Sequence, residues 1–381
     1  MDKVIYLDNA ATTFPKPNSV YDIMDDVNRN YAVNSGRGSY MLARKASLLI
    51  EETKEKILKL INADFNSKVI FSPSITISIN QVLNGLDFKS GSIIYISPYD
   101  HNAVARTLNL LQKRKNIRVR ELPVNELTCE IDIDRMKYLF TKEPPNCVCS
   151  TFISNVTGYI LPINDIFSEA KKYGAITVLD AAQSMGLLQM ELKNLNADFV
   201  AFAGHKTLYG PFGVGGFIYN CNIKLNEFIV GGTGSDSLNL EMPNNIPNKY
   251  ESASPNIIAI AGLNKAIDFV KYNNIYDEEK TLTNYLIQEL GKISTVKMYL
   301  PSNLDKHISI VSFNVEGYKS EDVGLILDED FSIAVRTGYH CSPFIHKYLK
   351  DEVYLGTVRA SLSYFNSKED IDLLAKAIKE L

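Results

Sequence analysis

The chain has 381 residues, of which 45% are hydrophobic and 22% charged, and its 21 tyrosines and 17 phenylalanines exclude an intrinsically disordered protein. A net charge of −4 argues against a nucleic-acid partner, which usually requires a basic surface, and no apolar run approaches the roughly 18 residues that span a membrane. The first residues carry no export signal, so we expect a cytoplasmic enzyme of roughly two or three domains with no membrane partner.

Apolar segments of strand length alternate with segments of helical period. After a short extended start at residues 6–7 a helix is expected beyond Pro17, and residues 42–61 place apolar side chains at spacings of three and four, as on one packing face of a helix. Strands are expected at residues 69–71, 93–96, 119–123, 148–153, 177–180, 199–203 and 214–219. This alternation predicts an α/β domain with a mainly parallel sheet and with ligands at the strand ends.

The second part of the chain has a different character. Residues 225–255 are rich in Gly, Asn, Ser and Pro, and such a long irregular segment within a compact chain favours a functional loop over a linker. Two helical stretches follow, and then a strand at 308–314, a helix at 320–327, strands at 331–336 and 358–365, and a helix at 371–381. Ser367 and Asp370 have the spacing of a cap for this last helix. We expect a smaller α+β domain here.

The five cysteines lie at positions 129, 147, 149, 221 and 341. Their odd number, the absence of C-x-x-C spacing and the absence of a nearby His cluster argue against a disulfide framework and against a zinc site. Cys147 and Cys149 alternate along an apolar run, so they are expected to be buried on one face of a strand.

The stretch Ala203-Gly204-His205-Lys206 carries the most chemical information. A lysine that directly follows a strand, in a loop of small residues, is placed to form a Schiff base with a carbonyl cofactor. Upstream, Asp180 ends another strand, where its carboxylate suits pairing with a protonated pyridine nitrogen. Either residue alone is a weak signal, because most Lys and Asp side chains at strand ends are simply solvated.

Further short motifs occur in order along nearly the whole chain. They are Tyr6-Leu7-Asp8-Asn9-Ala10-Ala11-Thr12-Thr13, Asn34-Ser35-Gly36-Arg37-Gly38, Asp100-His101-Asn102-Ala103-Val104, Ser154-Asn155-Val156-Thr157-Gly158, Asp180-Ala181-Ala182-Gln183, Gly204-His205-Lys206, Arg336-Thr337-Gly338-Tyr339-His340-Cys341 and Arg359-Ala360-Ser361. Together they resemble the cysteine desulfurase branch of the class V aminotransferases, which are fold-type I enzymes that use pyridoxal 5′-phosphate. The segment ending at Cys341 is specific to the desulfurases, since transaminating relatives need no cysteine there.

The resemblance implies a fold and an assembly. It implies a large cofactor-binding domain at residues 16–255, with a mainly parallel seven-stranded sheet flanked by helices. A small α+β domain is expected at residues 256–381, together with the N-terminal segment 1–15. The family also implies a homodimer in which each active site borrows the segment around Ser254 from the neighbouring subunit.

The resemblance also implies roles around the cofactor ring. Lys206 resembles the Schiff-base lysine and Asp180 the partner of the pyridine nitrogen. Gln183 corresponds to the residue that hydrogen-bonds the phenolic oxygen of the cofactor. His101 is expected to stack on the ring and to assist proton transfers.

A second group of residues is implied to handle the substrate. Asn155, which also contacts the cofactor, is expected to hold the substrate carboxylate with Arg359 and Arg336, and the planar fork of an arginine suits this task. Cys341 is the implied nucleophile, since a neighbouring cation favours the reactive thiolate. The short spacing from Arg336 to Cys341 resembles the group II, selenocysteine lyase-like subfamily, whose members typically need a separate sulfur-acceptor protein.

The expected phosphate site departs from the family pattern. His205, Thr76, the Ile75 N–H group and the partner's Ser254 are the implied phosphate ligands, at the N-terminus of a helix. Ile75 and Ala203 stand where relatives carry hydroxyl groups. Two missing charge-assisted hydrogen bonds at roughly 1.5–3 kcal/mol each predict weaker cofactor binding, by about 10²–10⁴-fold.

The implied reaction converts L-cysteine to L-alanine and leaves a persulfide on Cys341 for delivery to an acceptor, with selenocysteine as the other possible substrate. Two alternatives stay open. Another class V enzyme, an aminotransferase or a lyase acting on a different amino acid, predicts activity that survives Cys341→Ser. A non-catalytic relative with impaired cofactor binding predicts a protein without Schiff-base absorbance even at saturating pyridoxal phosphate.

Overall fold

The computed structural model describes residues 4–35, 38–234 and 238–381. Each of the seven strands expected in the first part of the chain is present, and together they form one sheet. The strands are β2 (Lys68–Ser72), β3 (Ile93–Ile96), β4 (Arg118–Glu121), β5 (Cys147–Thr151), β6 (Ile176–Asp180), β7 (Phe199–Ala203) and β8 (Gly215–Tyr219). Their order is β2-β8-β7-β6-β5-β3-β4, and within this sheet β8 runs antiparallel to both neighbours while the other pairings are parallel. The predicted α/β sheet is therefore confirmed.

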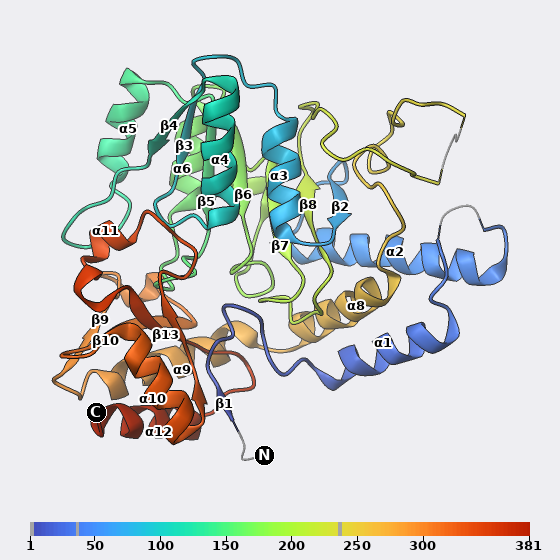
Figure 1. The fold of residues 1–381 in the computed structure, drawn as a ribbon. Helices are drawn as coiled ribbons and strands as arrows, with labels where there is room; N and C mark the ends of the chain where they lie inside the picture. The colour runs from blue at the N-terminus through green and yellow to red at the C-terminus, as the bar shows by residue number, and fades with distance from the viewer. Residues whose placement is uncertain (1–3, 36–37, 235–237) are drawn as a thin grey trace.

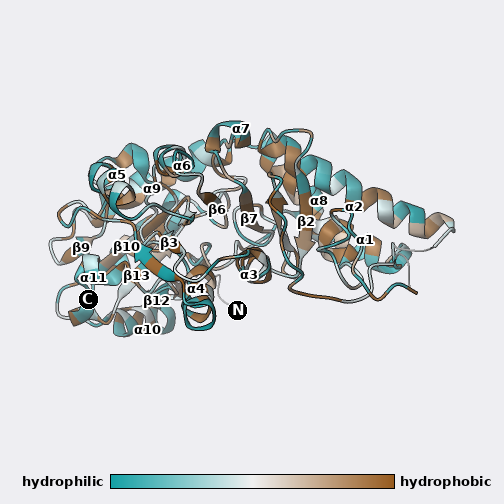
Figure 2. Ribbon diagram, turned by 90° about the horizontal axis from the view of Figure 1, so that it is seen from above, coloured by the Kyte–Doolittle hydropathy of each residue, from teal (hydrophilic) through white to brown (hydrophobic). Residues whose placement is uncertain are grey.

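Helices cover both faces of this sheet (Figure 1). One apolar cluster joins the sheet to α3 (Ile75–Gly85) and α4 (Asn102–Lys115). A second cluster joins the opposite face to α2 (Met41–Leu60), α5 (Ile133–Lys142), α6 (Ile163–Lys171) and α8 (Ile257–Tyr272). Seen from above, β6, β7 and β2 are brown, whereas the outer faces of the helices are largely teal (Figure 2).

Alternate side chains of strand β5 enter the two apolar clusters on opposite faces of the large sheet. Cys147 and Cys149 belong to the cluster on the α3 and α4 side, whereas Val148 between them belongs to the opposite cluster. The two sulfur atoms are 4.0 Å apart and both cysteines are buried. Alternate side chains of a strand point to opposite faces, so the prediction of two buried cysteines on one face is confirmed.

The helix expected at residues 42–61 is α2, and it buries Ala46, Ile50, Thr53 and Ile57 as the spacing predicted. Helix α1 (Asn18–Asn30) and α2 both pack against α8. The three helices form an elongated extension beside the sheet (Figure 1). Short helical turns complete this part of the chain at α7 (Leu192–Leu195) and, farther on, at η1 (Leu304–Lys306).

The C-terminal part contains an antiparallel sheet of four strands in the order β12-β13-β10-β9. Its strands are β9 (Val296–Met298), β10 (Ile310–Val315), β12 (Arg336–Gly338) and β13 (Thr357–Ser361). Side chains of α9 (Ile275–Leu290), α10 (Ser320–Phe331) and α12 (Lys368–Lys379) build a separate apolar core with it. Near its N-terminus the chain reaches this region, because β1 (Ile5–Tyr6) pairs with β11 (Ile333–Ala334). The domain boundaries at residues 16–255 and 256–381 stay a prediction.

Two strand predictions in this part were wrong in their limits. Phe331 ends helix α10, and the expected strand 331–336 is divided between β11 and β12, which belong to different sheets. The strand expected to reach residue 365 ends at Ser361. In contrast, the predicted cap of α12 is present: the Ser367 hydroxyl accepts the Asp370 N–H, and the Asp370 carboxylate accepts the Ser367 N–H.

The loop expected at residues 225–255 connects β8 to α8 and contains neither helix nor strand in its described portions, 225–234 and 238–255. Residues 235–237, and residues 36–37 of the Asn34–Gly38 motif, lie outside the described part of the chain. None of the described helices is both long and apolar enough to cross a membrane.

Candidate active site

Four neighbouring parallel strands bring the predicted residues to one edge of the large sheet. His101 follows β3, Asn155 follows β5, Asp180 ends β6 and Lys206 follows β7. These strands are adjacent in the order β7-β6-β5-β3, so their carboxyl ends meet at the same edge. Ligands of open α/β sheets bind at this edge.

Lys206 lies in a loop whose backbone is held from two directions. Its carbonyl oxygen accepts the Thr13 hydroxyl at 2.9 Å and the Tyr209 N–H at 2.8 Å. Burial lowers the pKa of the Lys206 ammonium, the positive charges of Arg359 and Arg336 lower it further, and the carboxylate of Asp180 opposes this shift. The amine is therefore more easily neutral, which is the form that attacks a carbonyl or accepts a proton.

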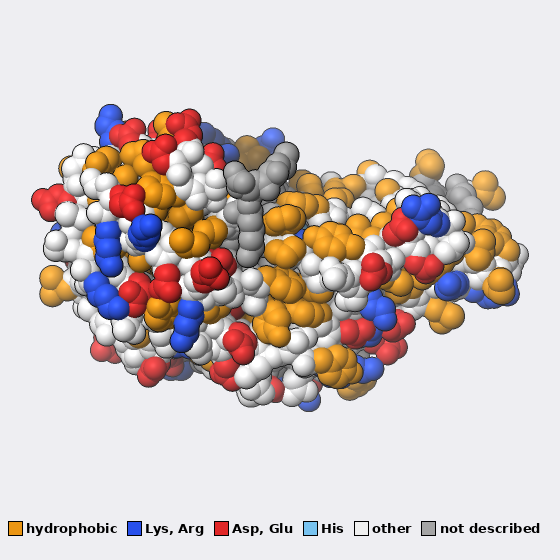
Figure 3. Space-filling model, turned by 90° about the horizontal axis from the view of Figure 1, so that it is seen from below, with side chains coloured by type: hydrophobic (Ala, Val, Ile, Leu, Met, Phe, Trp, Pro, Cys, Tyr) orange, Lys and Arg blue, Asp and Glu red, His pale blue; other side chains and the backbone are white. Residues whose placement is uncertain are grey.

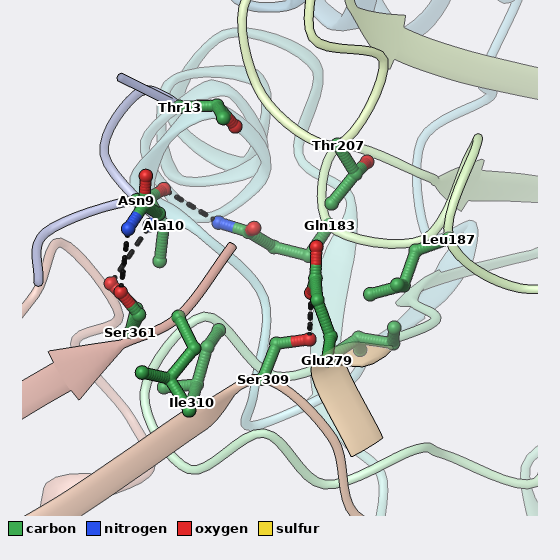
Figure 4. Close-up of a pocket in the computed structure, with 12 residues that line it drawn as sticks. Asn9, Ala10, Thr13, Gln183, Leu187, Thr207, Glu279, Ser309, Ile310 and Ser361 are labelled. Atoms are coloured by element: carbon green, nitrogen blue, oxygen red, sulfur yellow. Dashed lines mark hydrogen bonds between the residues drawn. The ribbon is translucent and has the colours of Figure 1, made fainter. Parts of the chain in front are cut away.

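Asp180 is buried, and its Oδ1 accepts the Ala182 N–H at 2.9 Å. Burial raises the pKa of the Asp180 carboxyl, so a cation at this position would be strongly attracted to its ionised form. Asp100 is a second buried carboxyl group, and its pKa is raised by burial and by the charge of Asp180. Gln183 donates from Nε2 to the Ala10 carbonyl at 2.8 Å, which joins β6 to the N-terminal segment (Figure 4).

His101 is the N-cap of helix α4, and its Nδ1 accepts the Ala103 N–H at 3.0 Å. A ring nitrogen that accepts a hydrogen bond carries no proton, so neutral His101 has its proton on Nε2. Burial lowers the pKa of His101 to about 4, with Lys206 and Arg336 as the next contributors. The ring is therefore a neutral donor through Nε2 at neutral pH.

Cys341 lies in a tight turn after β12. Gly338, His340 and Cys341 have φ values of +92°, +45° and +59°, a left-handed conformation that is unfavourable for His and Cys. The turn places Cys341 Sγ 3.9 Å from Nη2 of Arg336. A half-buried free thiol that a substrate can reach, on a turn beside a guanidinium, suits a nucleophile.

Three hydrogen bonds fasten this turn to the large sheet. Asn155 donates from Nδ2 to the His340 carbonyl at 2.6 Å and accepts the Ser342 hydroxyl on Oδ1 at 2.7 Å. The Asn102 N–H donates to the Cys341 carbonyl at 2.7 Å. The Asn155 amide therefore orients the Cys341 turn, and one of its two amide hydrogens remains for a ligand.

Arg359 is 2% exposed and lies directly across from Arg336 in the pairing of β13 with β12. Its Nη2 forms an ion pair with Asp8 at 2.6 Å, and its Nη1 donates to the Asn155 carbonyl at 2.8 Å. Its Nε is buried with no hydrogen-bond partner among the described residues. Two guanidinium groups against one carboxylate leave a net positive charge, which suits the carboxylate of a small substrate.

The N-terminus of helix α3 is the expected anion site. The Ser74 side chain caps the helix by accepting the Ile77 N–H at 3.3 Å, and the Ser74 carbonyl accepts the Ser78 N–H. The N–H groups of Ile75 and Thr76 thus remain as free donors in this first turn as far as the described residues show. Two backbone donors at a helix N-terminus suit a phosphate.

His205, which follows β7 and precedes Lys206, has a ring nitrogen that is available to a ligand. Its Nδ1 is buried without a partner in the described parts of the chain, its ring stacks on Phe212 at 4.5 Å, and burial lowers the pKa of His205 to about 3. Ala203, which lacks a hydroxyl, is buried at the end of β7. Ser254 is exposed, and its hydroxyl accepts a hydrogen bond from Asn34, so it is not part of the group assembled within one chain.

The sequence analysis did not identify two residues that contact the predicted site residues and hold them in place. Lys16 donates from Nζ to the His205 carbonyl at 2.8 Å, and burial lowers the pKa of its amine to about 7. Asp8, the partner of Arg359, lay inside a quoted motif but received no role. Lys16 lies between two prolines, and this sequence predicts only a turn. Asp8 pairs with an arginine that is far away in the sequence, so no local pattern could have identified the pair.

Glu279 was also missed, and it lines a small cavity between the N-terminal segment, the Lys206 loop and the C-terminal part (Figure 4). Its carboxylate accepts the Tyr209 hydroxyl at 2.7 Å and the Ser309 hydroxyl. Tyr209 Oη in turn accepts the Tyr364 N–H at 2.7 Å. Burial raises the pKa of Glu279 to about 7, although the two hydroxyl donors oppose the shift.

The chain is similar in sequence to a known family and to individual proteins within it. Residues 5–374 match the family Aminotransferase class-V. A probable cysteine desulfurase of Pyrococcus abyssi is 33% identical over 392 aligned positions, covering 100% of this chain and 94% of the relative. A cysteine desulfurase of Wigglesworthia glossinidia brevipalpis is 32% identical, covering 98% of this chain and 92% of the relative.

Solved structures agree with these sequences. The apo structure of a cysteine desulfurase from Thermococcus onnurineus superimposes with a TM-score of 0.91 at 32% identity, over 99% of this chain and 94% of that one. A cysteine desulfurase from Escherichia coli gives a TM-score of 0.84 at 25% identity, also over 99% of this chain and 94% of the other.

Proposed function

Since the chain belongs to the class-V aminotransferase family, we propose that it is a pyridoxal 5′-phosphate-dependent cysteine desulfurase that converts L-cysteine to L-alanine and transfers sulfur to Cys341. The observation that carries the proposal is the position of Cys341. Its thiol lies 3.9 Å from Arg336, on a turn fastened by Asn155 beside the strand ends that carry Lys206 and Asp180.

The unpartnered polar atoms of the site fit this cofactor. His205 Nδ1 and the N–H groups of Ile75 and Thr76 are donors for its phosphate. Asp180 is a buried carboxyl at the sheet edge for its pyridine nitrogen, and Lys206 is the amine for its aldehyde. When bound, pyridoxal phosphate accepts into its ring the electron pair that remains after a proton leaves the substrate α-carbon.

Lys206 and His101 handle the protons of the reaction. Neutral Lys206 Nζ takes the proton from the substrate α-carbon, and burial, which lowers the pKa of the Lys206 ammonium, favours this neutral form. The ionised form of Asp180 would pair with the pyridine nitrogen and favour its protonated form. His101 holds a proton on Nε2 that it can donate in the site, because its Nδ1 is occupied by the Ala103 N–H.

The substrate is held by Arg359, Arg336 and Asn155. A carboxylate beside Arg359 would satisfy its buried Nε, and the remaining amide hydrogen of Asn155 can donate to the same group. The Cys341 thiolate then attacks the substrate sulfur: an S–S bond forms, the Cβ–S bond breaks, and its electron pair stays on the carbon, which takes up a proton to become the methyl group of alanine. The persulfide on Cys341 passes its outer sulfur to an acceptor thiol.

We also propose an oligomeric state, a protein partner and a cellular compartment for the enzyme. Large apolar side chains are exposed in the loop after β8, including Val230 at 70% and Leu240 at 100%, and apolar side chains gather on the face seen from below (Figure 3). Such patches favour a homodimer, in which the exposed Ser254 of one subunit can serve the phosphate site of the other. The short Cys341 turn favours a separate acceptor protein, and the five free cysteines favour the cytoplasm.

The absorption spectrum of the protein supplied with pyridoxal phosphate, before and after L-cysteine, tests this proposal. We expect a visible Schiff-base band that L-cysteine changes, with release of alanine. A protein that shows no band at saturating cofactor would be the non-catalytic relative. A band that responds only to another amino acid would indicate another class V enzyme, and a preference for selenocysteine would indicate a selenocysteine lyase.

A further inference from the structure

A buried histidine and aspartate lie behind the Cys341 turn and take no part in the chemistry described above. His346 begins the short helix α11 (His346–Leu349), and Asp351 follows it, immediately before the turn η2 (Glu352–Tyr354). Both side chains are buried. Nδ1 of His346 is 2.6 Å from Oδ2 of Asp351, and its Nε2 is 3.0 Å from the carbonyl oxygen of Tyr339.

The partners of the two ring nitrogens fix the orientation of the ring. A backbone carbonyl can only accept, so Nε2 of His346 donates its hydrogen to the Tyr339 carbonyl. Nδ1 contacts the Asp351 carboxyl group, which holds the ring in this orientation.

Other side chains pack around His346. The ring of Tyr339 lies edge-on to the imidazole at 4.9 Å, and the ring of His340 lies 6.3 Å away. The next residue on the helix, Lys347, pairs with the half-buried carboxylate of Glu121. Among these neighbours, Asp351 is the side chain that hydrogen-bonds the imidazole.

The Tyr339 carbonyl is the point at which the pair reaches the active site. It accepts the His346 Nε2–H and also the Ser342 N–H at 3.1 Å, so it closes the turn that contains Cys341. The backbone of this turn is left-handed at three residues, and a conformation of this kind persists only when its surroundings hold it. Asn155 and Asn102 hold the turn from the large sheet, and His346 holds it from the opposite side.

We propose that His346, oriented by Asp351, is a positioning residue that fixes the Cys341 turn through the Tyr339 carbonyl. It contacts neither substrate nor cofactor. Its consequence for sulfur transfer rests on the proposed function, whereas its hold on the turn does not.

Amide hydrogen exchange tests the hold on the turn. In His346→Leu, exchange at Ser342 and Asn102 should accelerate by about tenfold, the effect of one lost hydrogen bond. His346→Gln should retain protection near that of the wild type, because its side-chain N–H can reach the same carbonyl. Lys347→Gln is the matched control on the same helix. Unchanged exchange in His346→Leu, or equal acceleration in the control, would contradict the positioning role.

Sulfur transfer provides the functional measurement. With pyridoxal phosphate and L-cysteine, His346→Leu should show the spectral change on cysteine binding seen in the wild type but about tenfold slower persulfide formation on Cys341. Equal rates of persulfide formation would contradict the proposal. If wild-type Cys341 gains no sulfur at all, the proposed function fails, while the exchange measurement still decides whether His346 holds the turn.

Discussion

At the scale of single residues, Arg359 shows how much of an active site consists of pre-arranged charge. Its two terminal nitrogens are fixed by Asp8 and by the Asn155 carbonyl, and its Nε is buried without a described partner. Burying a guanidinium with an unsatisfied N–H is costly unless a ligand completes its hydrogen bonds. The arrangement is therefore prepared for an anion before any substrate arrives.

We expect Arg359→Lys to weaken substrate binding more than the chemical step. Lysine keeps the charge and can still reach Asp8, but it loses the planar set of donors that holds a carboxylate. Loss of one charge-assisted hydrogen bond at roughly 1.5–3 kcal/mol predicts a rise of about 10–150-fold in the KM for L-cysteine. Steady-state kinetics measures this rise, and the exposed Arg29→Lys on α1 is the control. A KM within twofold of the wild type would remove Arg359 from the substrate site.

Local motifs predicted the residues to which we assign the chemistry, and the fold showed which residues contact and orient them. Lys206, Asp180 and Cys341 stand in recognisable motifs at the ends of strands. Asp8 and Asp351 are carboxylates whose partners, Arg359 and His346, become apparent only in the fold. A pairing between residues 8 and 359 depends on the crossing of β1 into the C-terminal part, and no sequence period encodes that crossing.

At the scale of secondary structure, the N-terminus of α3 holds the clearest departure from the family pattern. The helix offers the N–H groups of Ile75 and Thr76, but Ile75 and Ala203 bring no hydroxyl. The Ser74 hydroxyl cannot replace them without giving up the cap that it makes with Ile77. The element thus provides part of a phosphate site, and the missing part can be restored by substitution.

The double variant Ile75→Thr, Ala203→Ser should bind pyridoxal phosphate more tightly. Each restored hydroxyl adds a hydrogen bond to a charged phosphate, and at roughly 1.5–3 kcal/mol each the pair predicts a gain of about 10²–10⁴-fold in affinity. Titration of the cofactor-free protein measures it. The matched variant Thr76→Val should shift affinity in the opposite direction. Equal affinity of all three proteins would show that this turn does not bind the phosphate.

The positions of most strands and helices were predictable because the spacing of apolar residues within a short segment indicates each element. The wrong boundaries have physical causes. The segment 331–336 is apolar enough for one strand, but Ser332 ends α10 in a left-handed conformation, and the chain then passes between two sheets. Tyr364 and Phe365 continue the apolar pattern of β13, yet they turn away to pack on Phe269. Long-range packing decided both boundaries.

At the scale of the whole molecule, Glu279 joins the Lys206 loop to the C-terminal sheet. Tyr209, three residues after Lys206, donates to Glu279, and Ser309, at the start of β10, donates to the same carboxylate. Tyr364, which follows β13 and its Arg359, donates to the Tyr209 oxygen. Glu279 therefore links the Lys206 loop to the segments on either side of the C-terminal sheet, and Figure 4 shows its contact with Ser309.

The free energy of unfolding should depend on pH because of the Glu279 carboxyl group. Burial raises the pKa of Glu279 from 4.5 to about 7, so between these pH values the folded chain binds a proton that the unfolded chain has released. Stability from this group is complete below pH 4.5 and is lost as pH rises to about 7, by roughly 3 kcal/mol. The pKa of Lys16 is lowered to about 7, so this residue changes the pH dependence of stability only above about pH 7.

Urea unfolding of the wild type and of Glu279→Gln at pH 5 and pH 7.5 measures this loss. The difference between the two proteins should shift by roughly 3 kcal/mol in favour of Glu279→Gln at the higher pH. The exposed Glu278→Gln on the same helix is the control and should follow the wild type at both values. A difference between wild type and Glu279→Gln that is independent of pH would show that Glu279 does not titrate in this range.

The central claim is that Cys341 receives the sulfur of L-cysteine, and mass spectrometry of the alkylated Cys341 peptide tests it most directly. After L-cysteine is added to the protein loaded with pyridoxal phosphate, we expect one additional sulfur atom on Cys341 in the wild type and in the control Cys221→Ser. Cys341→Ser should retain the spectral change with L-cysteine but form no persulfide and release little alanine. Alanine release by Cys341→Ser at the wild-type rate, or a Cys341 peptide that never gains sulfur, would contradict the account.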